Sequence, residues 1–115
     1  DRNPDAVADL AVNLHDFDHV AVYEGEVESV LPLLTDSAEV VVAHPCSSGL
    51  SRQAMAALLA AKPARFVYVS SDVATLARDG RFLAKAGYKP VEVQPIDMQP
   101  QTYHIETVSL WQQAG

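Results

Sequence analysis

Residues 91–111 have the sequence VEVQPIDMQPQTYHIETVSLW, and this stretch decides the predicted fold. It contains two apolar patterns typical of strands, Val91–Gln94 and His104–Trp111, with nine residues between them. A crossover between parallel strands needs about a dozen residues or more. The two strands are therefore predicted to pair in an antiparallel arrangement.

Upstream of this stretch, apolar strand patterns alternate with helical patterns. Strands are expected at His19–Tyr23, Glu39–Ala43 and Arg65–Ser70. Helices are expected to begin at Asn3-Pro4 and to span Glu28–Leu34, Arg52–Lys62 and Ala74–Ala86, the last one stopped by Gly87. This alternation indicates an α/β fold. We predict a single domain over residues 1–115, with a mostly parallel sheet and an antiparallel last strand.

Composition and charge limit the function. Hydrophobic residues make up 49% of the 115 residues, which is enough for the core of one domain. No apolar run approaches the roughly 18 residues of a membrane span, so no membrane contact is expected. The single cysteine, Cys46, excludes an internal disulfide and fits the cytoplasm. A net charge of −7 opposes phosphate binding. The histidines lack the spacing of a metal site, so no metal is expected.

Five stretches form an ordered set of motifs: Asp1–Val7, Gly25–Glu28, His44–Leu50, Val67–Asp79 and Asp97–Glu106. The last two are the longest and most specific, with the sequences VYVSSDVATLARD and DMQPQTYHIE. In this order the stretches resemble the RNA (uracil-5)-methyltransferase family. The resemblance implies a Rossmann-like class I methyltransferase sheet, truncated at its N-terminus. It also implies S-adenosyl-L-methionine (SAM) as cofactor and an RNA substrate, although binding of RNA by this acidic chain alone is expected to be weak.

The resemblance implies roles for two residues near the ends of the last two motifs. In the family, a cysteine adds to C6 of uracil, which makes C5 electron-rich, and a glutamate later removes the C5 proton. Glu106 matches the base, but Ser71 stands at the position of the nucleophile, and a hydroxyl is far less nucleophilic than a thiolate. His104 lies two residues before Glu106, so both side chains are expected on one face of the strand. The chain alone is therefore expected to be inactive.

The third motif departs from the family at His44 and Ser47, where the family has Asp and Arg. Pro45-Cys46 also resembles the Pro-Cys motif of cytosine-5 methyltransferases, which makes Cys46 an alternative nucleophile, with His44 beside it to favour the thiolate. Structural interpretations stay open for both candidates. Cys46 is then a small buried residue at a strand end, and Ser71 a polar residue bonded to the adjacent turn.

Cofactor contacts are implied at two acidic residues. Asp1 matches the residue that holds the ribose of SAM, and Glu26 the residue that approaches the adenine. The glycine-rich loop that receives SAM is expected upstream of Asp1, so SAM binding by this chain is expected to be weak or absent. Arg78 and Asp79 are expected to form a local ion pair and cap.

Two functions therefore remain open. The chain is part of a cytoplasmic RNA methyltransferase, or it is a non-catalytic scaffold or interaction domain with a methyltransferase fold. In either case Glu39–Ala43 is expected to lie at an exposed sheet edge, through which a homodimer could form.

Overall fold

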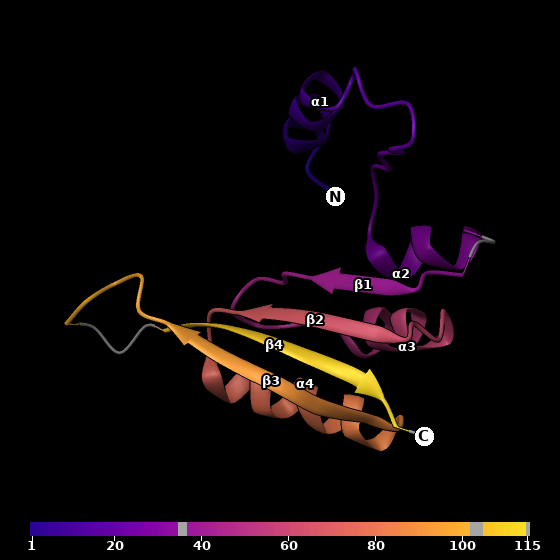
Figure 1. Cartoon of the computed structure of the whole chain (residues 1–115). Coiled ribbons are helices and arrows are strands. Elements are labelled where there is room, and N and C mark those ends of the chain that lie inside the picture. The colour runs from indigo at the N-terminus through magenta and orange to yellow at the C-terminus, as the bar shows by residue number, and fades with distance from the viewer. Residues whose placement is uncertain (35–36, 102–104, 115) are drawn as a thin grey trace. The chain divides into compact units, whose positions relative to one another are not determined.

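The computed structural model describes residues 1–34, 37–101 and 105–114 (Figure 1). The chain forms two compact units, Asp1–Asp36 and Ser37–Gly115, and each is described by itself. No helix in the described part of the chain is long and apolar enough to cross a membrane.

The first unit begins with helix α1, Pro4–Asn13, at the place predicted from Asn3-Pro4. The side chain of Asn3 caps this helix, because its oxygen accepts hydrogen bonds from the backbone N–H groups of Asp5 (2.9 Å) and Ala6 (3.4 Å). A short helix α2, Val27–Val30, continues directly into the 3-10 turn η1, Leu31–Leu33, in the region where a short helix was expected.

The predicted strand at His19–Tyr23 is wrong. These residues have no strand assignment, and the end of the segment bonds to a single residue. The Asp1 amino group donates to the carbonyl of Tyr23, and the Gly25 N–H donates to the carbonyl of Asp1, both at 3.0 Å. Asp1 thus bonds to Tyr23 and Gly25, the residues on either side of Glu24, which is the hydrogen-bond pattern of a bridge between parallel strands. The segment lacks a strand in the described structure because a ladder needs a neighbouring strand, and only Asp1 pairs there.

The second unit contains a four-stranded sheet in the order β1-β2-β4-β3. Its strands are β1 Val40–Ala43, β2 Arg65–Ser70, β3 Tyr88–Ile96 and β4 Glu106–Gln113. Strands β1 and β2 pair in parallel, whereas β4 lies antiparallel to both β2 and β3. The predicted antiparallel last strand is therefore confirmed. His104, where that strand was expected to begin, lies outside the described residues.

Two longer helices accompany the sheet, and Figure 1 shows both behind it. Helix α3, Arg52–Ala60, is capped by Ser51, whose hydroxyl accepts from Ala54 N–H at 3.0 Å. Helix α4, Val73–Lys85, is capped by Asp72, whose carboxylate accepts from Thr75 N–H at 2.9 Å. Gly87 follows α4 with a φ of +94°, a conformation that favours glycine, as expected for the residue that stops this helix.

The sheet buries one face only. On that face lie alternate residues of β2 and β4, among them Phe66, Tyr68, Ser109 and Trp111, and all four are buried. Gly80 of α4 brings its helix against the Trp111 ring, because a Cβ added there would lie 3.0 Å from the ring. This contact fixes α4 on the buried face.

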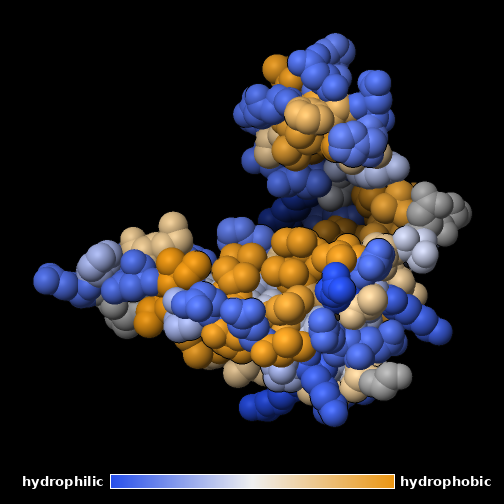
Figure 2. Space-filling model, in the orientation of Figure 1, coloured by the Kyte–Doolittle hydropathy of each residue, from blue (hydrophilic) through white to orange (hydrophobic). Residues whose placement is uncertain are grey.

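The opposite face, here called the open face, carries a cluster of apolar residues from three strands, which is visible as the central orange area of Figure 2. The cluster consists of Val40, Val42, Val67, Val69, Val108 and Leu110, and the register places Arg65 and Gln112 on the same face. Val42 is 68% exposed, although sheets with parallel strands normally have both faces covered.

Candidate functional site

The sheet topology brings most of the predicted site residues to one end of the strands, the end at which the parallel strands β1 and β2 finish. Strands β1 and β2 are parallel, so their carboxyl ends meet there, and the loop His44–Leu50 and Ser71 follow these ends. Strand β4 is antiparallel to β2 and therefore begins at the same edge, with Glu106. Ligands of open α/β sheets bind outside the carboxyl ends of the parallel strands.

Ser71 and Glu106 face each other by register. Ser70 pairs with Thr107 in the β2–β4 ladder, and Ser71 and Glu106 each lie one residue further toward the edge. Both are half-buried. Within the described residues, neither side chain makes a hydrogen bond. His104, the expected companion of Glu106, lies outside the described residues.

The turn at Ser71 is held by hydrogen bonds of the Ser70 side chain. The Ser70 hydroxyl donates to the carbonyl of Asp72 at 2.7 Å and accepts from the Asp72 N–H at 3.1 Å. The interpretation that Ser71 itself serves this turn is therefore wrong.

The loop after β1 exposes its two candidate residues. Both His44 and Cys46 are exposed, so the interpretation of Cys46 as a small buried residue is wrong. The Cys46 sulfur lies 3.0 Å from the Ser48 hydroxyl. The Gly49 N–H donates to the Cys46 carbonyl at 2.8 Å, which closes a four-residue turn around Ser47.

Helix α4 holds the backbone of this loop through three side chains. The Thr75 hydroxyl donates to the Ser47 carbonyl at 2.7 Å. Arg78 Nη2 donates to the carbonyls of Ser48 (2.8 Å) and Leu50 (3.3 Å), and the Leu50 N–H donates to Asp79 Oδ2 at 3.1 Å. The expected local Arg78–Asp79 ion pair is present at 3.0 Å, but sequence reasoning missed the contacts with the loop.

Asp79 is a fully buried carboxylate that bonds to three other residues in the described part of the chain. Its Oδ2 accepts from the Leu50 N–H and accepts a short hydrogen bond from the Tyr68 hydroxyl, whereas its Oδ1 accepts from Arg78 Nε at 3.0 Å. Burial raises the pKa of Tyr68 above its ordinary value, and the hydrogen bond to Asp79 and the charge of that carboxylate raise it further. Tyr68 therefore stays protonated as a donor to Asp79.

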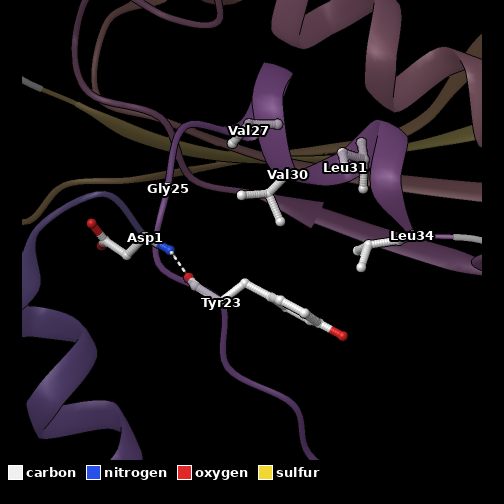
Figure 3. Close-up of a pocket in the computed structure, with 7 residues that line it drawn as sticks. All are labelled: Asp1, Tyr23, Gly25, Val27, Val30, Leu31 and Leu34. Carbon is white, nitrogen blue, oxygen red and sulfur yellow. Dashed lines mark hydrogen bonds between the residues drawn. The ribbon is translucent and has the colours of Figure 1, made fainter.

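The two predicted cofactor residues lie in the first unit, where Asp1 lines a small apolar pocket (Figure 3) and Glu26 is not among the lining residues. The pocket has a volume of about 130 Å³ and is lined by Asp1, Tyr23, Gly25, Val27, Val30, Leu31 and Leu34. Glu26 forms an ion pair with Arg2 at 3.2 Å, and the Asp1 carboxylate accepts from the Asn3 N–H at 2.9 Å. Asp1 and the segment that carries Glu26 are thus joined within this unit.

Among the residues that the structure describes, no group of three His, Cys, Asp or Glu side chains could hold a metal ion.

Comparison with known proteins finds relatives that match this chain over part of their own length. No family model matches the chain. An uncharacterised RNA methyltransferase of Clostridium tetani is 41% identical over 106 residues, which are 90% of this chain and 23% of that protein. Another, of Caldanaerobacter subterraneus, is 51% identical over 73 residues, which are 64% of this chain and 16% of that protein. The chain thus spans less than a quarter of the length of these curated relatives.

Two solved structures resemble the fold. The tRNA (uracil-54, C5)-methyltransferase of Pyrococcus abyssi, in complex with S-adenosyl-L-homocysteine, matches with a TM-score of 0.79 and 27% identity over 96% of this chain and 27% of that chain. An rRNA methylase of Streptococcus thermophilus matches with a TM-score of 0.71 over 100% of this chain and 71% of that chain. Its identity is 9%, so this likeness shows the fold alone.

The mixed sheet, with antiparallel β4 between β2 and β3, together with these two structures, defines the fold of the class I SAM-dependent methyltransferases. The sequence relatives are named as RNA methyltransferases, and the chain corresponds to a fragment of a protein of that family.

Proposed function

We propose that this chain is the carboxyl-terminal part of a cytoplasmic RNA methyltransferase-like protein directed at C5 of a pyrimidine, with uracil as the favoured base. The supporting observation is the placement of Ser71 and Glu106 one residue beyond the last pair of β2 and β4. In the family that the motifs resemble, these positions hold the nucleophile and the base. The P. abyssi tRNA (uracil-54, C5)-methyltransferase shares the fold at 27% identity.

The chemistry points to a defect at the nucleophile. Methylation at C5 needs a temporary covalent bond from the nucleophile to C6 of uracil. Once C5 carries the methyl group that SAM would supply, the C5 proton passes to a base, the double bond between C5 and C6 forms again, and the nucleophile leaves C6. The Glu106 carboxylate can accept that proton. The Ser71 hydroxyl has no hydrogen-bonded base among the described residues, so nothing described activates it, and this chain does not complete the reaction.

SAM, which supplies the methyl group when bound, fits the chain only in part. Asp1 and Glu26 would hold its hydroxyl and adenine groups, and Val27, Val30 and Leu31 would supply an apolar wall. However, the pocket of about 130 Å³ is smaller than the roughly 300–1,000 Å³ of typical small-molecule sites. The residues of this chain therefore provide part of a cofactor site, and the chain alone binds SAM weakly.

Charge is distributed unevenly, and this bears on RNA binding. Nine of the 15 acidic residues but one of the eight basic residues lie within residues 1–36. Residues 37–115 therefore carry seven basic and six acidic side chains. The sheet edge with Ser71 and Glu106 thus belongs to a nearly neutral unit, which lowers the electrostatic barrier to RNA below that expected from the net charge of −7.

A second candidate function, a scaffold or interaction domain, is favoured by the exposed apolar parts of the sheet. Strand β1 is an edge strand, and Val40 and Val42 on it are exposed. Unpaired edge strands with apolar side chains tend to pair with another chain. In this alternative, the isolated chain forms a homodimer through β1.

The first candidate can be tested by trapping the covalent adduct. RNA that contains 5-fluorouridine retains the adduct, because the fluorine at C5 cannot leave as a proton does. The longest native form of the protein is incubated with this RNA and SAM, and bands that resist denaturation are sought. We expect no band from the native protein and a band from Ser71→Cys. Ser70→Cys is a matched control, because position 70 is buried, and it should give no band.

Three other outcomes would change the proposal. A native band that Ser71→Ala abolishes would show that the serine is competent. A native band that Cys46→Ala abolishes would move the nucleophile to the loop after β1 and favour a cytosine-5-like reaction. No band from Ser71→Cys, despite measurable SAM binding, would favour the interaction domain.

A further inference from the structure

The loop His44–Leu50 has little structure of its own. In the described chain, its backbone makes one internal hydrogen bond, from Gly49 N–H to the Cys46 carbonyl. Gly49 has a φ of +81°, which disfavours other residues. A loop with so few internal bonds depends on its surroundings for a single conformation.

Those surroundings are three side chains of α4, and the loop atoms to which they bond are all backbone atoms. The Thr75 hydroxyl donates to the Ser47 carbonyl, and Arg78 donates to the carbonyls of Ser48 and Leu50. The Asp79 carboxylate accepts from the Leu50 N–H. The side chains of residues 46–48 are exposed and take no part in these bonds. The conformation of the loop backbone is therefore determined by α4, while the side chains of residues 46–48 are exposed to solvent.

The close approach of the loop to α4 requires a glycine. A Cβ added to Gly49 would lie 2.5 Å from Arg78 Nη2, 2.5 Å from the Thr75 methyl carbon and 2.6 Å from Asp79 Oδ2. All three contacts are far below van der Waals distance. Gly49 and the three side chains of α4 thus form one complementary unit.

The same helix is joined to the other side of the site. Asp72 caps α4 directly after Ser71, and the Ser70–Asp72 hydrogen bonds fix the turn between β2 and α4. Asp79 is in addition anchored to β2 through Tyr68. Helix α4 thus connects the Ser71 turn to the Cys46 loop through packed, hydrogen-bonded groups.

We propose that Thr75, Arg78 and Asp79 are positioning residues that hold the Cys46 loop at a fixed place relative to Ser71. The proposed function supplies the reason why this placement matters, because both segments would border the pyrimidine. The residues act through the loop backbone and do not themselves touch the reacting atoms.

Cys46 provides a reporter that does not depend on methyl transfer. The rate at which iodoacetamide alkylates Cys46 is measured against pH for the native chain and for Thr75→Val, Thr75→Ser, Arg78→Ala and Arg81→Ala. We expect Thr75→Val and Arg78→Ala to change the rate or its pH profile by about fivefold, the factor typical of one lost hydrogen bond. Thr75→Ser keeps the hydroxyl and should restore the native profile. Arg81→Ala removes an exposed arginine of the same helix and should have no effect.

Native profiles in folded Thr75→Val and Arg78→Ala would overturn the proposal. If these variants do not fold, hydrogen exchange of the native chain decides, because the Leu50 amide should exchange much more slowly than that of Ser48, and equal exchange would overturn the proposal. Failure of the 5-fluorouridine experiment would reject the proposed reaction but leave these results unchanged. The two proposals can therefore fail separately.

Discussion

Tyr68 on β2 donates a hydrogen bond to Asp79 on α4, and both side chains are completely buried. This bond joins the sheet to the helix that holds the loop after β1. A carboxylate in such a place is costly to leave without partners, and the partners of Asp79 among the described residues are Leu50, Tyr68 and Arg78 of the second unit.

We expect Tyr68→Phe to destabilise the chain by about 1.5–3 kcal/mol, since the lost bond is to a charged acceptor. Tyr88→Phe is the matched control, because the Tyr88 hydroxyl donates at 2.6 Å to the neutral carbonyl of Pro63, and we expect a cost of about 1 kcal/mol. Urea unfolding followed by circular dichroism measures both. Equal costs for the two variants would show that the charge of Asp79 adds nothing to the bond.

Alkaline pH should destabilise the chain through the same tyrosine. Burial and the bond to Asp79 raise the pKa of Tyr68 in the folded state, and burial raises that of Tyr88. The unfolded chain therefore loses these protons first, and stability falls as pH rises above the unfolded value of about 10. Unfolding free energies measured at increasing pH should fall less steeply in Tyr68→Phe. Ionisation of all tyrosines in the folded chain near pH 10, seen by ultraviolet absorbance, would contradict this expectation.

Gly49→Ala should be more harmful than Gly87→Ala. Both glycines have positive φ, so an alanine is strained at either position by about 1–2 kcal/mol. At Gly49 the new methyl also meets Arg78, Thr75 and Asp79, whereas nothing lies within 4 Å of a Cβ at Gly87. Thermal unfolding measures the difference, and the alkylation rate of Cys46 shows whether the loop has moved. A Gly49→Ala variant as stable as Gly87→Ala would mean that the loop can leave α4 at no cost.

The sequence predicted the sheet topology more completely than it predicted the contacts of the candidate site. The nine residues between the last two strand patterns were enough to predict an antiparallel β4, because chain length limits the possible connections. The strand at His19–Tyr23 was predicted wrongly because a local pattern cannot show whether a neighbouring strand is present. The contacts of Thr75, Arg78 and Asp79 with the loop join residues 28–30 positions apart, beyond any local pattern. The close family match of Thr75–Asp79 was the signal that could have pointed to them.

Self-association through β1 should depend on its exposed apolar side chains. We expect the isolated chain to form dimers and Val42→Lys to be monomeric, because a lysine on an edge strand opposes pairing. Val93→Lys is the control, since Val93 is also exposed but lies on β3, an edge strand that contains Pro90 and Pro95. Light scattering over a dilution series distinguishes the variants. Monomers of the native chain at all concentrations, or equal effects of both substitutions, would exclude β1 as the contact.

The last prediction concerns methyl transfer by the isolated chain. We expect no transfer of a labelled methyl group from SAM to uridine in RNA, either by the native chain or by Ser71→Cys. The native chain has a serine hydroxyl in place of a soft, ionisable nucleophile. The cysteine variant still offers the cofactor the pocket of about 130 Å³ that Asp1 lines, and it keeps His44 and Ser47 at two further site positions. Ser71→Cys should nevertheless gain a second alkylatable thiol beside Cys46, which shows that position 71 is accessible. Ser71→Cys combined with Glu106→Gln controls for the base. Methyl incorporation by Ser71→Cys that this double variant lacks would show that residues 1–115 contain a complete catalytic site after all.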